Sequence, residues 1–287
     1  MLRLTTLRLK IAHLNVEIDC SAKACAAGIG ALTQLFKRST GKITADLSFA
    51  ITGHDDGITL CADGEKLWQS DDAGEVVAAF EWAFYNRTIA ALYPQFLSLH
   101  ASTFAIGDDC ITCAGKSGSG KSSLCTVALL HGASYFTDEY TLLDRQGNIT
   151  AFPRPLQWGG TTHPAFAQQT MSVSGLFSHG RYTFTDRNGA HVESLLWHAK
   201  HVAKKSVPMT LLLLPRFDTA AEGVQIEPLP RSQALLELAA EMHHQLPTQQ
   251  RIHELNRRMP KDLRYLRVVF SDVHQAWQQI ESLIGKT

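Results

Sequence analysis

The chain has 287 residues, 45% of them hydrophobic, so it is long enough for one large domain or two small ones with a buried core. Its 27 lysines and arginines equal its 27 aspartates and glutamates, and this zero net charge argues against a general nucleic-acid binder or a polybasic membrane protein. Arg3, Arg8 and Lys10 interrupt the N-terminal apolar run, so we expect no signal peptide. The longest uncharged stretch, 88–107, contains Pro94 and several polar residues, so we expect no membrane span and a cytoplasmic protein.

The first part of the chain has the pattern of a small α+β module. Its predicted strands are 7–18, 43–51 and 58–61, and its predicted helix is 24–36. Apolar residues at helical spacing predict a second helix over 73–92, which Pro94 ends. We therefore expect an N-terminal α+β module over residues 1–72 and a second domain over residues 73–287.

From residue 97 onward, short strands alternate with helices. The predicted strands are 97–106, 110–114, 134–137, 140–143, 209–214 and 266–270, and the predicted helices are 121–131, 232–243 and 272–284. Gly132 is expected to end the helix before it in a left-handed conformation. A strand, a glycine-rich loop, a helix and a further strand in this order are typical of an α/β nucleotide-binding sheet.

The glycine-rich loop fits the phosphate-binding pattern G-x-x-x-x-G-K-[ST] in full. Glycines allow backbone N–H groups to approach phosphate oxygens, and the following helix adds its positive N-terminal end. In such a loop Lys121 reaches the β- and γ-phosphates of a nucleotide, and the Ser122 hydroxyl binds Mg²⁺. The predicted nucleotide-binding residues are Gly115, Lys116, Ser117, Gly118, Ser119, Gly120, Lys121, Ser122 and Ser123.

Two acids, Asp138 and Glu139, follow the next predicted strand and are expected to return to the same edge of the sheet as the loop. Carboxylate oxygens there suit Mg²⁺, and a phosphoryl acceptor needs a carboxylate to take its proton. The alternative is a solvated acidic turn. His100, on the strand before the loop, is by itself more typical of a packed or hydrogen-bonded histidine.

Other candidate residues carry weaker patterns. Cys110 and Cys113 form a C-x-x-C, the spacing of a redox pair or of half a zinc site, but no second C-x-x-C exists and they lie in a strand-like run where small apolar cysteines commonly pack. A loose histidine-rich group in a segment expected to be helical, 191–201, fits a surface helix better than a metal site; its members are His191, Glu193, His198 and His201. Arg154 and Arg216 are candidates for phosphate contact, because guanidinium groups pair well with anions.

Together these residues resemble the HPr kinase/phosphorylase family, and the wider sequence is similar to its HPr-kinase-related kinase A subgroup. The resemblance rests on LHAS (99–102), GKSGSGKSS (115–123) and Asp138-Glu139, and it covers roughly residues 75–287. It implies a P-loop fold shared with phosphoenolpyruvate carboxykinases, namely a mixed sheet with flanking helices. It also implies ATP as donor, a serine hydroxyl as the usual acceptor, and a homo-oligomer, since members often form rings.

Residue by residue, the resemblance implies that His100 is an active-site histidine, Lys121 the phosphate lysine and Ser122 a Mg²⁺ ligand. Asp138 would assist the metal, and Glu139 stands where the family places its proton acceptor, normally an aspartate. Two departures stand out. Residues 154–164 contain no acid where the family has a glutamate-bearing loop, and only Lys204 and Lys205 represent a later basic loop, which makes HPr itself an unexpected substrate.

The leading hypothesis is an ATP- and Mg²⁺-dependent kinase that phosphorylates a serine of a peptide or protein, or a small hydroxylated metabolite. The alternative is a nucleotide-binding sensor or assembly module without a phosphoryl acceptor, which the missing second metal acid and the substituted base position favour. A carboxykinase-like enzyme acting on a small acid is a third hypothesis. It requires further metal ligands that the sequence does not provide.

Overall fold

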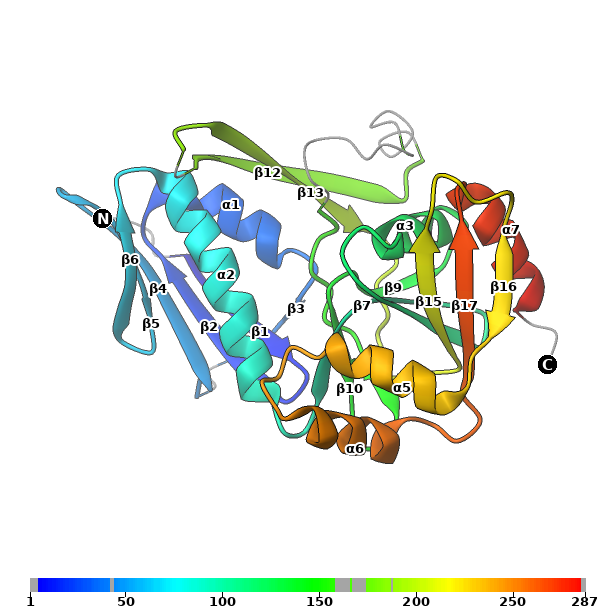
Figure 1. The fold of residues 1–287 in the computed structure, drawn as a ribbon. Helices are drawn as coiled ribbons and strands as arrows, with labels where there is room; N and C mark the ends of the chain where they lie inside the picture. Colours follow the sequence, from blue (N-terminus) through cyan, green and yellow to red (C-terminus); the bar gives the residue numbers. More distant parts are fainter. Residues whose placement is uncertain (1–4, 42–43, 158–165, 167–173, 187, 285–287) are drawn as a thin grey trace. The chain divides into compact units, whose positions relative to one another are not determined.

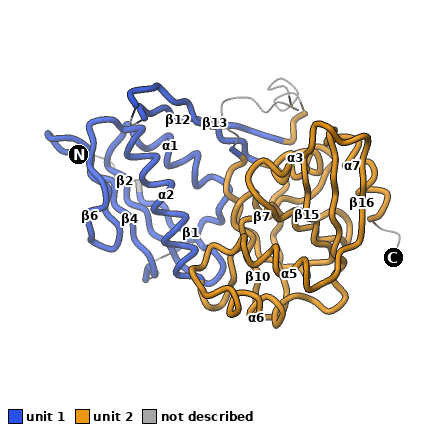
Figure 2. The backbone as a smooth tube through the Cα atoms, in the orientation of Figure 1, with its two compact units in different colours: residues 1–92, 157–163, 177–198 blue, residues 93–156, 164–176, 199–287 orange. Residues whose placement is uncertain are grey.

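The computed structural model describes residues 5–41, 44–157, 166, 174–186 and 188–284, and it confirms the expected α/β class (Figure 1). Helices pack against mixed β-sheets. The chain divides into two compact units (Figure 2). The first unit comprises residues 1–92, 157–163 and 177–198, and the second comprises residues 93–156, 164–176 and 199–287.

The first unit is built on a six-stranded sheet. Its strands, in order across the sheet, are β3 (Lys37–Arg38), β1 (Thr5–Ile11), β2 (Leu14–Cys20), β4 (Leu47–His54), β5 (Gly57–Ala62) and β6 (Glu65–Ser70). Residues 7–18, expected as one strand, belong to the hairpin β1–β2 instead, because Ala12 takes a left-handed conformation (φ 50°) and turns the chain. Neither glycine nor proline marks this turn, so the alternating pattern runs through it.

Two helices, α1 (Lys23–Thr33) and α2 (Ala73–Leu92), pack against each other and against this sheet. Phe80 and Phe84 on α2 stack with ring centroids 5.4 Å apart, and Phe49 on β4 lies edge-on to both rings. This shared apolar core explains why α2 belongs to the first unit, although the sequence places a boundary between residues 72 and 73.

A two-stranded sheet, β12 (Phe177–Thr185) and β13 (His191–Ala199), packs against α1 and α2. At Gly74 of α2, an added Cβ would lie 1.6 Å from a carbonyl oxygen of β12, so only glycine allows this approach. The helix predicted over residues 191–201 is wrong. The Asp186 carboxylate accepts two backbone N–H groups of the intervening turn, at 2.9 and 2.8 Å, and the reversed chain pairs with β12.

The second unit holds a nine-stranded mixed sheet. Its strands, in order, are β14 (Val207–Pro208), β11 (Asn148–Thr150), β10 (Tyr140–Leu143), β7 (Leu97–Ile106), β8 (Asp109–Ala114), β15 (Leu211–Phe217), β17 (Arg264–Phe270) and β16 (Gln225–Pro228), while β9 (Ser134–Thr137) pairs with β7 off this path. β15 runs parallel to β8 and β17, whereas β7 and β16 are antiparallel to their neighbours. The strands predicted after residue 97 are therefore confirmed, and the leucines that open β15 are buried, as expected for a central parallel strand.

The described helices of the second unit are α3 (Lys121–Leu130), α5 (Arg231–Ala240), α6 (Thr248–Arg258) and α7 (Val273–Leu283). Gly132 follows α3 with φ 90°, which is the expected left-handed helix end. The sequence does not predict α6, because most of its residues are polar and it buries only Leu255 and Arg258. None of the helices in the described ranges combines the length and apolar character needed to cross a bilayer.

The chain after α5 leaves the helix earlier than predicted. α5 ends at Ala240 instead of continuing to residue 243. The His100 N–H donates to the Glu241 carbonyl oxygen at 2.6 Å, and Leu99 forms an isolated antiparallel bridge with Met242. Residues 241–243 therefore extend the sheet beside the first half of β7 instead of completing a helical turn.

The C-x-x-C pair packs inside the sheet. All six cysteines are free thiols, and Cys110 and Cys113 are both buried on β8. Residues three apart on a strand point to opposite faces, so the two thiols do not face each other. Burial raises the pKa of Cys110 to about 12, which is the behaviour of a packing residue and not of a reactive thiol.

Candidate functional site

The glycine-rich loop joins the end of β8 to the start of α3. Gly115, Gly118 and Gly120 have φ angles of 148°, 79° and 99°, where L side chains are strained. A Cβ added at Gly120 would also lie 2.6 Å from Cζ of Phe270. The Ser119 hydroxyl oxygen is buried and has no hydrogen-bond partner within the described chain. This loop therefore needs its glycines, and it holds a polar group ready for a ligand.

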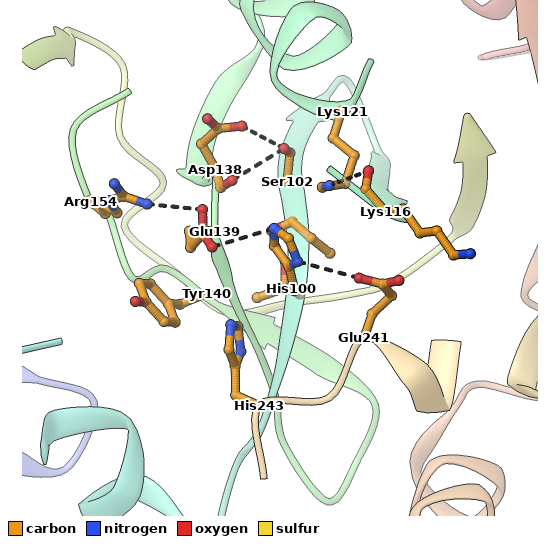
Figure 3. A network of polar contacts seen from close by, with 12 residues as sticks. His100, Ser102, Lys116, Lys121, Asp138, Glu139, Tyr140, Arg154, Glu241 and His243 are labelled. Atoms are coloured by element: carbon orange, nitrogen blue, oxygen red, sulfur yellow. Dashed lines mark hydrogen bonds and ion pairs between the residues drawn. The ribbon is translucent and has the colours of Figure 1, made fainter. Parts of the chain in front are cut away.

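Lys121 opens α3, and its ammonium group lies over the loop. Nζ donates to the two loop carbonyl oxygens of Gly115 and Lys116, at 2.6 and 3.1 Å, and the residue is 5% exposed (Figure 3). Burial lowers the pKa of this ammonium group, and nearby carboxylates, led by that of Glu241, act in the opposite direction. A buried cation thus stands at the loop, close to negative charge.

Asp138 follows β9 and is buried beside the loop helix. The Ser102 hydroxyl donates to its Oδ1 at 2.5 Å, and the Ser122 side chain is hydrogen-bonded to the same carboxyl group. Burial, partly opposed by these hydrogen bonds, raises the pKa of Asp138 to about 6. The structure thus brings together Ser122 and Asp138, the two residues predicted as Mg²⁺ ligands.

Glu139 lies next in the chain but in a different environment. Its side chain is 30% exposed, and its Oε2 accepts from Nη1 of Arg154 at 2.9 Å. Its Oε1 lies 3.4 Å from Nε2 of His100. The two predicted acids therefore split into a buried carboxyl beside the loop and a more exposed carboxylate held between a guanidinium group and an imidazole (Figure 3).

His100 lies on β7 with both ring nitrogens facing carboxylates. Nε2 faces Glu139, and Nδ1 lies 3.3 Å from Oε2 of Glu241. The ring centroid of His243 is 6.0 Å away, and that ring in turn packs on Tyr140 with centroids 4.8 Å apart. His100 is thus part of a polar network and is not a packed core histidine (Figure 3).

The sheet explains how these residues meet. β8 and β9 both pair antiparallel with β7, so they run in the same direction and end at the same edge. The loop follows β8 there, and the acid pair follows β9. His100 and Ser102 are two residues apart on β7, so their side chains share one face and meet Glu139 and Asp138.

Sequence reasoning missed several members of this network. Ser102 had a usable signal, because it lies two residues after His100 on a predicted strand. Glu241 and His243 had none, because the helix predicted over 232–243 places them on a helical surface. Their contribution depends on where α5 ends.

Other predicted residues lie elsewhere or in different roles. Arg154 belongs to the network through Glu139, whereas Arg216 is 69% exposed and pairs with Asp218. The histidine-rich group is not assembled: His198 is buried with Nε2 2.7 Å from the Ala31 carbonyl oxygen, and the described residues contain no group of three or more metal-binding side chains. The segment 154–164, which contains no acid, falls largely outside the described residues.

No protein-family model matches the chain, and a search of curated proteins finds no match to it. The resemblance to the HPr kinase/phosphorylase family thus stays a prediction.

Proposed function

We propose that the chain is an ATP-dependent kinase that transfers the γ-phosphoryl group to a hydroxyl, that of a serine in a peptide or protein or of a small metabolite. The observation that carries this proposal is the pairing of two acids in contrasting environments with a complete phosphate-binding loop. Asp138 is buried against Ser122, and Glu139 is exposed enough to meet an acceptor. In kinases, one carboxylate helps to hold Mg²⁺ and another accepts the proton of the acceptor hydroxyl.

Phosphate binding is supported by the loop and its lysine. The Ser119 hydroxyl lacks a hydrogen-bond partner among the described groups, and the ammonium group of Lys121 donates to the loop carbonyl oxygens of Gly115 and Lys116. Phosphate oxygens satisfy both groups, since they accept hydrogen bonds and carry negative charge. In the proposed complex, Lys121 neutralises charge that develops on the transferred group.

The donor set also fits Mg²⁺. The Ser122 hydroxyl and the Asp138 carboxylate are hard oxygen ligands in contact with each other, and this ion keeps several water and phosphate ligands besides those from protein. A bound Mg²⁺ would neutralise phosphate charge. It would also favour the ionised form of Asp138, which burial alone disfavours.

Glu139 is the proposed proton acceptor. The acceptor hydroxyl oxygen forms a bond to the γ-phosphorus, the bond from that phosphorus to the β–γ bridging oxygen breaks, and ADP leaves. The hydroxyl proton passes to the Glu139 carboxylate, which Arg154 and His100 hold from two sides. Asp138 is less suited to this role, because it is 6% exposed and bonded to two serines.

The test is transfer of γ-labelled phosphate from Mg·ATP into an extract of the source cells, separated into protein, peptide and metabolite fractions. Lys121→Ala should abolish labelling, because it removes the cation at the phosphates. Glu139→Gln should lower the rate about 10²- to 10⁴-fold while ATP binding persists, because it removes the base only.

Lys261→Ala and Glu222→Gln serve as matched controls, because both side chains are exposed. Labelling that survives in both Lys121→Ala and Glu139→Gln would contradict the mechanism. ATP binding without any labelled acceptor would instead favour a nucleotide-binding sensor or assembly module.

A further inference from the structure

Glu241 enters the network through its backbone as well as its side chain. Its carbonyl oxygen accepts from the His100 N–H at 2.6 Å, and two residues later the His243 N–H donates to the Ser98 carbonyl oxygen at 3.0 Å. With the Met242 bridge between them, these bonds fix residues 241–243 along β7. The position of the Glu241 Cα therefore does not depend on what its side chain does.

The Glu241 side chain is buried among charged groups. It is 12% exposed, and its Oε2 lies 3.3 Å from Nδ1 of His100. Its negative charge is also the largest electrostatic influence that raises the pKa of Lys121. This carboxylate thus lies near both the proposed phosphate lysine and the histidine that contacts the proposed base (Figure 3).

Helix stability does not explain a glutamate here. Glu241 is the C-cap of α5, where the negative end of the helix dipole disfavours a carboxylate. Burial adds further cost, because a carboxylate that is only 12% exposed has lost most of its solvation. An acid at position 241 is best explained by the groups that its carboxylate influences, His100 and Lys121.

A histidine ring can rotate by half a turn about its Cβ–Cγ bond, and this rotation exchanges the positions of its nitrogens and carbons. A hydrogen bond at one ring nitrogen determines how the other is presented. Since a carboxylate only accepts hydrogen bonds, this arrangement needs a proton on both ring nitrogens of His100, with Nδ1–H toward Glu241 and Nε2–H toward Oε1 of Glu139. Without the Glu241 carboxylate, the His100 ring would keep only its contact with Glu139 in this orientation.

Resting on the kinase function proposed above, we propose that Glu241 is a positioning residue, which orients the His100 ring so that Nε2 holds the Glu139 carboxylate toward the acceptor hydroxyl. The Arg154 guanidinium group contacts the other oxygen of the Glu139 carboxylate, Oε2. Glu241 thus acts on Glu139 through His100 and does not touch the acceptor.

The kinetic test uses Glu241→Gln, which keeps the size of the side chain and removes its charge, with Glu237→Gln on the preceding helix α5 as the control. Glu237 is 41% exposed and pairs with Arg267. We expect Glu241→Gln to lower kcat about tenfold, as loss of an orienting carboxylate does elsewhere, with KM for ATP unchanged. In a His100→Ala background the same substitution should have no further effect. An equal loss of kcat in both backgrounds, or a change in KM alone, would overturn the proposal.

A second measurement is independent of activity. The ring ¹⁵N resonances of His100, assigned by their loss in His100→Ala, should shift in Glu241→Gln and stay in place in Glu237→Gln. If they shift while wild-type protein phosphorylates nothing, the positioning role stands and the kinase function fails. If wild-type protein is a kinase and the resonances do not move, the positioning role is wrong.

Discussion

Asp138 and Glu139 are neighbours in the chain, yet they have different surroundings. The Asp138 carboxyl is buried and hydrogen-bonded to two serine side chains, whereas the Glu139 carboxylate lies between the Arg154 guanidinium group and the His100 imidazole. Both residues lie in the bend between β9 and β10, outside the strands, so each side chain is placed by its own partners. One dipeptide can thereby supply a ligand for a cation and an acceptor for a proton.

The raised pKa of Asp138 has a consequence for stability in the absence of nucleotide and Mg²⁺. Its pKa rises from 3.8 to about 6, so folding favours the protonated form; this stabilisation is full below pH 3.8 and is lost as pH rises through about 6. Asp138→Asn is neutral at every pH and keeps an oxygen for the Ser102 hydroxyl. At pH 8 it should therefore raise the free energy of unfolding, by up to about 3 kcal/mol.

Urea unfolding at pH 8 and pH 5 measures this effect, with the exposed Asp55→Asn as the control. The advantage of Asp138→Asn should shrink at the lower pH. A variant that is less stable than wild-type protein at pH 8 would show that the ionised carboxylate contributes favourably through its hydrogen bonds.

One buried arginine at the end of α6 anchors this helix to neighbouring segments of the second unit. Arg258 is 3% exposed, and its guanidinium group donates to the carbonyl oxygens of Pro94, Gln95 and Leu143 at 2.8, 3.0 and 3.4 Å. It also pairs with Glu254 one turn earlier at 3.1 Å. A single side chain thus ties the end of α6 to the segment before β7 and to the end of β10.

Arg258→Ala should lower the free energy of unfolding by about 3 kcal/mol, because three carbonyl oxygens lose this donor and Glu254 loses the buried one of its two arginine partners. Arg257→Ala is the matched control. Arg257 pairs with the same Glu254 but is 57% exposed, so its loss should cost at most about 1 kcal/mol. Chemical denaturation of both variants gives the comparison, and equal losses would contradict an anchoring role for Arg258.

The elements that the sequence predicts well are those whose pattern is local. The strand, glycine-rich loop and helix over 110–131 follow from residue types that only this geometry accommodates. Segment 191–201 was mispredicted because its apolar run LLW fits a buried strand or a helix equally well. The end of α5, and with it Glu241, is set by pairing with β7, which no local pattern records.

Buried histidines in both units make the folding stability of the protein depend on pH. Burial lowers the pKa of His243 and His244 in the second unit from 6.5 to about 4, and it lowers the pKa of His198 in the first. The Ser98 N–H donates to Nε2 of His244, a bond that requires an unprotonated nitrogen. As pH falls below 6.5, the unfolded chain binds these protons first, so folding loses stability down to about pH 4.

We therefore expect the melting temperature to fall between pH 6.5 and pH 4, and to fall less in a His243→Gln/His244→Gln double variant. Protonation of Asp138 acts in the opposite direction over part of this range, but it is one group against three histidines. Calorimetry across this range tests the expectation, with the exposed His274→Gln as control. A melting temperature that stays level or rises on acidification would refute it.

The short segment beside β7, residues 241–243, contributes side chains to this site but does not depend on them for its own position. Residues 241–243 are held by backbone hydrogen bonds, which any non-proline side chain leaves intact, while the side chains of Glu241 and His243 lie beside His100. The loop proposed to bind phosphate belongs to a different part of the chain, between β8 and α3. Substitutions at positions 241 and 243 can therefore vary the surroundings of His100 without displacing the backbone that carries them. For laboratory evolution, these two positions are a compact target.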